Sequence, residues 1–489
     1  MVFRGENRAT RRLHPLEKAL LIVTAIQLCF LPWALGGMNV WSQFVSLALS
    51  LTAFTLSLVN RQYTEEFARE GEFKLVMWPK LIRFPIFWLG LGLLIYMTVQ
   101  ACNPAWAYRT SSNGNYWWMV QISHINWLPT GMTAPYSDMN AWRTIVIFAA
   151  PWLTACALWV GITRRITLIG LLGTLAINGG LLAAVGILMC VAGNGKILWF
   201  ITPSKGALFV SSFVYKNHAG DYFNLVLTVC TGLMFWYFSR SERASNRSNP
   251  APIFGFAGVL LGMIVILSGS RASTILLMVF LVLAVAGLIL RLTLLGNEGR
   301  SPFALGLFAF ILVLFVGGGL YALDQGRSIE GVERLTTQDF GSSVLLRQKA
   351  AEATWIMAKD KLVTGWGAGS YRHYFPMYQQ HYPELLRRPD GHTYYWDYAH
   401  NDYLQILAEL GLVGAFFLVA GAFSYGFKLL RHGIFSRPHA VFILMGLLMT
   451  MGHAWVDMPF FCPAILVTWC ALWVLVTRWV EFEDNRVRD

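Results

Sequence analysis

About twelve apolar stretches, each long enough to cross a lipid bilayer, constrain this chain more than any other feature. A membrane-spanning helix needs about 20 apolar residues. Ordinary soluble domains carry about 25% charged residues, whereas this chain carries 13% and has a mean hydropathy of +0.51. We therefore predict an all-α polytopic membrane protein with about 12 transmembrane helices. The stretches lie near 17–35, 39–59, 81–101, 144–160, 166–192, 220–239, 251–269, 272–291, 302–322, 403–427, 439–457 and 461–479.

The distribution of Lys and Arg predicts how these helices are oriented. Basic residues collect in short cytoplasmic loops, and an N-terminus inside the cell puts more than half of the 38 Lys and Arg residues there. Among the short outside loops, the only basic residue is Arg271. We expect both chain ends in the cytoplasm and the longer segments 102–143, 193–219 and 323–402 outside. Topology thus accounts for the net charge of +12, and nucleic-acid binding is not needed to explain it.

This topology divides the chain into three parts. Residues 1–322 hold nine helices, and the first of them has no small-residue cleavage site after it, so we expect it to remain uncleaved. Residues 323–402 form a large, partly helical outside loop between the ninth and tenth helices. Residues 403–489 hold three helices and a cytoplasmic tail. Loops longer than about 15 residues are usually functional or disordered, and this one is rich in Tyr and Trp.

Within the large loop, "SSVLLRQKAAEATWIMAKDK" has the pattern of an amphipathic helix. Ser342 or Ser343 can cap its start, and "TGWGAG" ends it. We expect the helix to lie on or near the outer membrane face. Its predicted apolar positions are Val344, Leu345, Ala351, Trp355 and Ala358.

The chain lacks the usual signatures of a metal, disulfide or nucleotide site. The seven cysteines are scattered without a CxxC pair. His373, His381, His392 and His400 are far apart and form no HExxH motif. The glycine-rich "GWGAGS" follows no strand and precedes no GK[ST], so a nucleotide-binding loop is not indicated. We expect no metal and no cofactor.

The stretch "YWDYAHNDYLQILAELG", residues 395–411, places polar groups where the large loop re-enters the membrane. Asn401, Gln405 and Glu409 share one helix face, which should point into the protein because polar groups facing lipid are costly. Asn401 or Asp402 can cap the helix. His400 is either an interface residue or a general base, a role that suits histidine near neutral pH.

A second polar signal is "ILSGSRASTIL", where Ser270 and Arg271 fall at a tight outside turn. Arg271 in the first turn of a helix opposes both the helix dipole and the cytoplasmic bias of basic residues. A bound anion would resolve both conflicts, because exposed N–H groups and a guanidinium bind phosphate together. The alternative is contact with a lipid headgroup phosphate.

Three further polar positions lie on the outside. Arg347 sits among apolar neighbours in the large loop, either as a ligand for an anion or as a solvated or snorkelling charge. Lys216, Asn217 and His218 precede a span, where they can serve as interfacial anchors and caps. Asp457 follows another span and can orient a His or Arg, or simply cap.

Together, these segments resemble the O-antigen ligase and polymerase superfamily of bacterial polysaccharide assembly. The resemblance rests on the Arg after "SGS", the Arg-bearing segment before "GWGAGSY", and "HNDYLQILAELGLVG", and it is strongest over about 250–460. It implies a multi-pass protein of the inner membrane with its active site on the periplasmic face. The implied partners are a glycan donor linked to undecaprenyl diphosphate, membrane lipids, and an acceptor that is lipid A core, a growing polysaccharide or a protein.

The resemblance also implies roles for individual residues. His400 would activate the acceptor hydroxyl, while Arg271 and Arg347 would hold the diphosphate leaving group. The substrate-binding residues would further include Asn401, Asp457 and, by a looser match, Lys216 and Asn217. Acceptor recognition would fall in the loop 373–398, where Arg387 and Arg388 suit a phosphorylated acceptor.

Two other classes of protein compete with a glycan transferase. A transporter or flippase of glycan-related lipids would need ionisable residues deep in several spans, and the sequence offers mainly Glu409. A scaffolding or sensing protein would not need Arg271, Arg347 and His400 together. Polar groups instead gather at the outer ends of the spans, which favours chemistry at the membrane surface.

Overall fold

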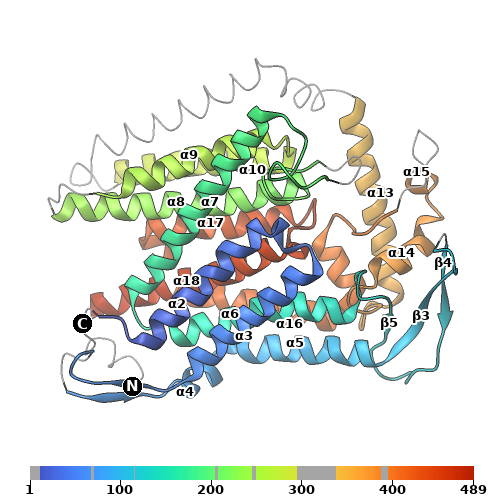
Figure 1. Cartoon of the computed structure of the whole chain (residues 1–489), viewed down its shortest axis with the longest axis horizontal. Helices are drawn as coiled ribbons and strands as arrows, with labels where there is room; N and C mark the ends of the chain where they lie inside the picture. The colour runs from blue at the N-terminus through green and yellow to red at the C-terminus, as the bar shows by residue number, and fades with distance from the viewer. Residues whose placement is uncertain are drawn as a thin grey trace.

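A computed structural model describes residues 12–67, 71–114, 116–203, 208–244, 249–294, 338–386 and 395–488. Long helices run back and forth between two ends of the molecule (Figure 1). Both chain termini lie at one end, which we call the terminal end. A small sheet and the helices of residues 338–386 lie at the other, which we call the site end.

Among the described residues, eight helices are long and apolar enough to span a membrane, and three shorter helices are also apolar. Each coincides with a predicted stretch, so the all-α polytopic fold class is confirmed. The stretch 302–322 lies outside the described residues, so the total number of spans stays a prediction. The helices are α2 (Pro15–Trp33), α3 (Val40–Leu58), α5 (Pro85–Cys102), α6 (Ala141–Gly161), α7 (Arg165–Ala192), α8 (Lys216–Ala244), α9 (Ala251–Leu267), α10 (Arg271–Leu294), α16 (Asp402–Arg431), α17 (Pro438–His453) and α18 (Pro463–Arg488).

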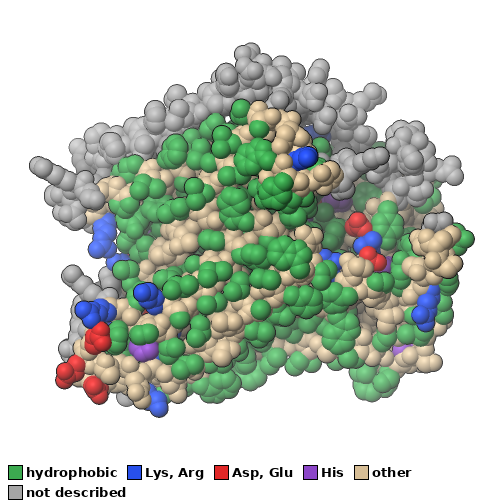
Figure 2. Space-filling view, in the orientation of Figure 1, with side chains coloured by type: hydrophobic (Ala, Val, Ile, Leu, Met, Phe, Trp, Pro, Cys, Tyr) green, Lys and Arg blue, Asp and Glu red, His purple; other side chains and the backbone are tan. Residues whose placement is uncertain are grey.

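The surface follows the pattern expected of a bilayer-embedded bundle. Figure 2 shows hydrophobic side chains over the middle of the visible face, with most charged side chains towards the two ends. In the most apolar stretch of each helix, 89% of the residues are buried in α18 and 72% in α6 and α8, whereas 28% are buried in α5 and α16. α6, α8 and α18 therefore form the centre of the bundle, and α5 and α16 present apolar faces to lipid.

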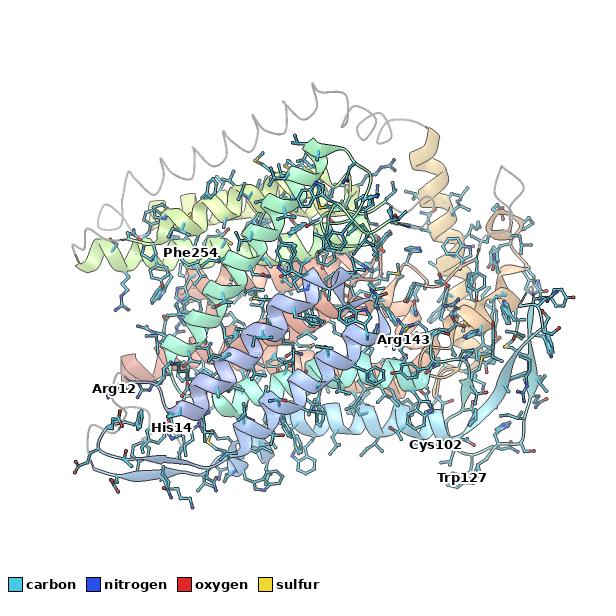
Figure 3. All side chains as sticks on the ribbon, in the orientation of Figure 1. Arg12, His14, Cys102, Trp127, Arg143 and Phe254 are labelled. Atoms are coloured by element: carbon cyan, nitrogen blue, oxygen red, sulfur yellow. The ribbon has the colours of Figure 1, made fainter. Side chains whose placement is uncertain are left out.

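Two small sheets, which the all-α prediction did not include, lie in connections between helices. β1 (Arg61–Tyr63) pairs antiparallel with β2 (Phe73–Leu75) after α3. Within the predicted outside loop 102–143, β3 (Pro104–Thr110) lies between β4 (Trp117–Gln121) and β5 (Gly131–Thr133). Figure 3 shows Cys102 and Trp127 beside this sheet at the site end, while Arg12 and His14 lie at the terminal end.

A buried ion pair fixes the terminal end. Arg61 Nη1 lies 2.9 Å from Glu17 Oε2, and neither side chain is exposed. The Glu17 carboxylate also accepts from the Thr163 N–H at 3.0 Å and the Thr167 hydroxyl at 2.8 Å, while Arg61 donates to the Gly161 carbonyl. Buried charges are tolerated where pairing and hydrogen bonds satisfy them in this way. The contacts connect α2, α6 and α7.

The helix predicted in the large loop is present, and the face that it buries in the protein differs from its predicted apolar positions. α13 (Gln338–Asp360) begins before Ser342 and Ser343, so neither caps its start. Val344, Leu345 and Trp355 are exposed and, of the five predicted apolar positions, only Ala358 is fully buried. The buried stripe is instead Ala350, Ala353, Thr354, Met357 and Ala358.

Apart from Met357, the buried stripe of α13 has small side chains, which allow it to pack closely on other helices. It joins a cluster with α14 (Tyr371–Gln379), α15 (Pro383–Leu386) and the start of α16. Tyr371, Phe375 and Ala408 belong to this cluster. Tertiary packing therefore decided which face of α13 is buried, and the largest apolar side chains of the helix point elsewhere.

Candidate active site

Asp457, in the turn between α17 and α18, brings together residues that are distant in sequence. Its Oδ1 lies 3.3 Å from Nδ1 of His400, and its Oδ2 lies 3.6 Å from Nη2 of Arg347. Asp457 is 1% exposed, whereas the side chains of His400 and Arg347 are 25% and 36% exposed. A buried carboxylate thus holds two partly accessible groups that can also reach a ligand.

Two more side chains complete what we call the Asp457 cluster, which comprises Tyr215, Asn217, Arg347, His400 and Asp457. The Tyr215 hydroxyl donates to Asp457 Oδ2 at 3.1 Å, and the Asn217 amide donates to the same oxygen. The Asn217 amide also lies 2.7 Å from the Tyr215 hydroxyl. The cluster therefore draws on the start of α8, on α13, on the start of α16 and on the α17–α18 turn.

The electrostatics keep Asp457 ionised. Burial alone would raise the pKa of its carboxyl group, but the hydrogen bond and charge of His400, with the charge of Arg347, outweigh burial and hold the pKa well below its usual range. Burial raises the pKa of the Tyr215 hydroxyl, and the Asp457 charge raises it further. Tyr215 is therefore a neutral donor and Asp457 an anion across the physiological pH range.

His400 adopts an unusual backbone conformation at this junction. Its φ is +51°, in the left-handed region that non-glycine residues adopt rarely and at a cost. The Trp396 ring meets the imidazole edge to face at 5.9 Å between centroids. Immediately after it, Asn401 Oδ1 accepts from the Leu404 N–H at 3.0 Å and so caps α16. Asp402 is not the cap, because its Oδ2 accepts from the Phe460 N–H at 2.9 Å.

The polar face of α16 points into the protein and supports this junction. Gln405 Oε1 accepts from the Ala399 N–H at 2.9 Å. Glu409 Oε2 accepts from the Gly369 N–H at 2.8 Å, and its Oε1 accepts from the Tyr371 N–H at 3.1 Å. These bonds use the carboxylate of Glu409 structurally, as an anchor for the start of α14.

The glycine-rich loop is a packing element. Gly365 has a φ of +69°, and a Cβ there would come within 2.3 Å of the Glu409 carbonyl oxygen. The Trp366 and Gly367 N–H groups donate to the carbonyls of Ala408 and Glu409. Glycine is thus required so that this loop can approach the backbone of α16.

Arg347 also contacts the α17–α18 turn directly. Its Nη1 donates to the Val456 carbonyl at 2.9 Å, one residue before Asp457. Because a guanidinium carries five N–H donors, these two contacts leave donors for an anionic ligand. The contacts with Val456 and Asp457 hold Arg347 in position, and its remaining N–H groups can still donate hydrogen bonds.

Lys216 contacts the turn that precedes Arg271. Arg271 is the first residue of α10, and Lys216 is the first residue of α8. Lys216 Nζ donates to the Gly269 carbonyl at 3.0 Å, two residues before Arg271. The next residue along α8, Asn217, belongs to the Asp457 cluster. The start of α8 therefore connects the turn before Arg271 with the Asp457 cluster.

Sequence reasoning missed two parts of the site. Tyr215 stands directly before the Lys216–Asn217 pair, and its position at a span boundary was the available signal. Asp221 and His453 form a buried pair with 2.9 Å between Oδ1 and Nδ1, and each is 1% exposed. Polar residues inside apolar spans could have indicated this pair, but their mutual distance depends on how α8 packs on α17.

The arrangement has the parts of a transfer site for an anionic leaving group. A histidine oriented by a buried carboxylate can accept a proton through its other ring nitrogen. Guanidinium groups can bind phosphate oxygens in forked geometry. The start of α10, where Arg271 is partly exposed, supplies further N–H donors.

Comparison with known protein families gives one match to this chain. Residues 256–419 match the family model described as O-antigen ligase. The match covers Arg271, Arg347, His400 and Asn401, while Tyr215, Lys216, Asn217 and Asp457 lie outside it. No curated protein matches the chain. Residues 256–419 are therefore similar to the O-antigen ligase domain, and this match supports the resemblance to the O-antigen ligase and polymerase superfamily.

Proposed function

We propose that this protein transfers a glycan from undecaprenyl diphosphate to an acceptor hydroxyl at the periplasmic face of the inner membrane. The observation that carries the proposal is the convergence of His400 and Arg347 on Asp457, at one end of a membrane-spanning bundle. The acceptor would be lipid A core, a growing polysaccharide or a protein. Both termini would lie in the cytoplasm.

In the proposed reaction, His400 acts as general base. Nδ1 of His400, facing Asp457, would carry the ring proton and donate to the carboxylate, leaving Nε2 as the acceptor. Nε2 would take the proton of the incoming hydroxyl as its oxygen attacks the anomeric carbon. The bond from this carbon to the phosphate oxygen breaks, and the lipid diphosphate leaves with the electron pair. The Asp457 anion stabilises the imidazolium that forms.

Arg347 and Arg271 would stabilise the charge of the leaving diphosphate. Positively charged groups placed where negative charge develops lower the barrier most when they are already held in position. Arg347 is held by Asp457 and by the Val456 carbonyl, and Arg271 starts α10 beside the Lys216 contact. No metal ion is required in this mechanism, because basic side chains take its electrostatic role.

The competing transporter function has less support. It would need ionisable groups near the bilayer midplane. The buried Asp221–His453 pair is ionisable, but His453 is the last residue of α17 and lies four residues before Asp457. This pair therefore belongs to the site end of the bundle, close to the Asp457 cluster.

Glycan transfer in detergent tests the proposal. The purified protein would be given an undecaprenyl-diphosphate-linked glycan and an acceptor, with and without a chelator. His400→Ala should lower turnover by about 10²–10⁴-fold, the usual contribution of a general base, while leaving donor binding intact. Near-full turnover by this variant would exclude His400 as the base, and inhibition of the wild type by the chelator would exclude the metal-free mechanism.

The matched control is His381→Ala, since His381 is exposed on the same side of the molecule. His218 is a poor control because it is buried and its Nε2 lies 3.2 Å from the Met458 carbonyl, next to Asp457. Deleting the gene in its host and separating surface glycans on a gel would then identify the acceptor. Loss of lipid A-linked ladders indicates a ligase, short chains a polymerase, and unglycosylated protein an oligosaccharyltransferase.

A further inference from the structure

A second group of charged side chains lies beside His400 and plays no part in the mechanism above. Arg372, on α14, faces Asp138 and Asp397, with Nη1 3.8 Å from Asp138 Oδ1 and Nη2 3.3 Å from Asp397 Oδ1. Its Nε donates to the Tyr395 hydroxyl at 3.3 Å, and its guanidinium lies 5.3 Å from the Tyr395 ring centroid. We call Asp138, Arg372, Tyr395 and Asp397 the Arg372 cluster.

The ion pairs of this cluster leave much of its hydrogen-bonding capacity unused. Charge-assisted N–H···O bonds are usually about 2.7–2.9 Å long, and both pairs are longer than that. The side chains are also accessible: Asp397 is 51% exposed, Asp138 29% and Arg372 23%. A ligand could therefore find carboxylate acceptors and guanidinium donors here without displacing a short, buried salt bridge.

The Arg372 cluster is next to the proposed base. Asp397 precedes His400 by three residues, and the intervening backbone is held in place because the Ala399 N–H donates to Gln405. Trp396, between Tyr395 and Asp397, contacts the His400 imidazole. Burial raises the pKa of the Asp397 carboxyl, and His400 is one of the positive groups that oppose this rise. Asp397 and His400 thus lie within electrostatic range of each other.

Two groups of charged residues near His400 differ in net charge. The Asp457 cluster and the neighbouring turn contribute Arg347, Arg271 and Lys216 against the one carboxylate of Asp457, a formal charge of +2, which suits a diphosphate. The Arg372 cluster contributes two carboxylates against one guanidinium, a formal charge of −1, which disfavours phosphate. Neutral hydroxyl groups suit the Arg372 cluster, because carboxylates accept and a guanidinium donates hydrogen bonds.

We propose that Asp138, Arg372 and Asp397 form a subsite for an uncharged, hydroxyl-rich sugar ring of the acceptor, next to His400. This inference rests on the proposed function, in which His400 takes a proton from an acceptor hydroxyl. It adds that the ring carrying this hydroxyl is unphosphorylated where it meets the protein. Arg387 and Arg388, suggested by the sequence for a phosphorylated acceptor, lie outside the described residues.

Steady-state kinetics test the subsite. The acceptor would be lipid A-core glycolipid purified from cells that lack this gene, and the donor would be saturating. For Asp397→Asn, Asp138→Asn and Arg372→Lys, we expect the acceptor KM to rise about 10–100-fold, the size expected for hydrogen bonds to charged groups. We expect kcat and the donor KM to stay within about threefold of wild type. Glu384→Gln, an exposed acid on α15 outside the cluster, is the matched control and should change nothing.

The opposite kinetic result would assign another role to Arg372. If the variants lower kcat and leave the acceptor KM unchanged, the cluster only clamps residues 395–400 and positions His400, and the sugar subsite is overturned. An acceptor KM equal to wild type in all three variants would overturn it as well.

Direct binding separates this inference from the proposed function. The probe would be the oligosaccharide released from the same glycolipid by mild acid and dephosphorylated, titrated against tryptophan fluorescence, since Trp396 borders the cluster. Wild type and His400→Ala should bind it, and Asp397→Asn should bind it at least tenfold more weakly. If no glycan is transferred but this binding pattern holds, the proposed reaction fails and the subsite stands. If the wild type does not bind the probe, the subsite is wrong even where transfer is observed.

Discussion

Oδ1 of Asp457 lies 3.3 Å from Nδ1 of His400, although 57 positions separate the two residues in the chain. The carboxylate is buried at the α17–α18 turn, and the imidazole stands at the entrance to α16. The contact therefore depends on how the last helices of the bundle pack. It gives the proposed base a defined orientation and a fixed counter-charge.

Replacing Asp457 should disable the proposed base while leaving it in place. Asp457→Asn removes the charge that stabilises the imidazolium and can present an N–H to Nδ1 of His400. We expect kcat for glycan transfer to fall about 10²–10⁴-fold, with donor and acceptor KM changed much less. Size-exclusion chromatography would show that the variant is folded. Turnover within about threefold of wild type would mean that Asp457 is only a structural contact.

Lysine substitutions of the two arginines test forked binding of diphosphate. Arg347→Lys and Arg271→Lys keep the positive charge but lose the planar pair of donors. We expect both variants to remain strongly impaired in transfer and to bind the lipid-diphosphate donor more weakly. Arg109→Lys, at an exposed position on β3, is a suitable control. Wild-type activity of Arg271→Lys would leave only a generic need for positive charge.

Thiol labelling in intact cells tests the proposed orientation. The positions first suggested by the sequence, Gly331 and Gly391, lie outside the described residues. Cys102 is exposed at the site end, and Glu65, next to the Glu66 that pairs with Arg12, is exposed at the terminal end. Native Cys102 should react with an impermeant thiol reagent from the periplasm. Glu65→Cys in a Cys102→Ser background should react only after the inner membrane is permeabilised. The reverse pattern would invert the topology and remove the periplasmic site.

His373 should make the stability of the folded protein depend on pH. Burial lowers the pKa of this histidine from 6.5 to about 4, with a further contribution from Arg372. The folded state therefore binds its proton less readily than the unfolded state, so His373 lowers stability as pH falls from about 6.5 to about 4. A phenylalanine ring at this position suits the neighbouring rings of Tyr108 and Trp117. In the His373→Phe variant, the melting temperature should therefore depend less on pH in this window. An unchanged slope would contradict the assignment.

The lengths of the apolar stretches were enough to predict the spanning helices that the structure describes, because the bilayer imposes length and apolarity on each span. The inward-facing stripe of Asn401, Gln405 and Glu409 was also predictable, since lipid excludes unpaired polar groups. The buried face of α13 was not predictable. Packing against neighbouring helices, and not the hydrophobicity of the side chains, determines that Ala350 and Ala353 are buried. The Tyr215–Asp457 contact was equally hidden, as it depends on where α8 meets α17.

The last prediction concerns Glu409, the acid that the sequence placed deep in a span. Its carboxylate accepts from the N–H groups of Gly369 and Tyr371 and from the Gln405 amide at 3.2 Å. Glu409→Ala leaves these buried donors unsatisfied, so we expect a loss of unfolding free energy of about 3 kcal/mol or more. Glu409→Gln keeps one oxygen for one of the two N–H groups and should retain part of the stability. Thermal unfolding in detergent would measure both variants. If Glu409→Ala unfolds at the wild-type temperature but loses transfer activity, Glu409 acts in the chemistry or in ion movement and does not serve as the anchor of α14.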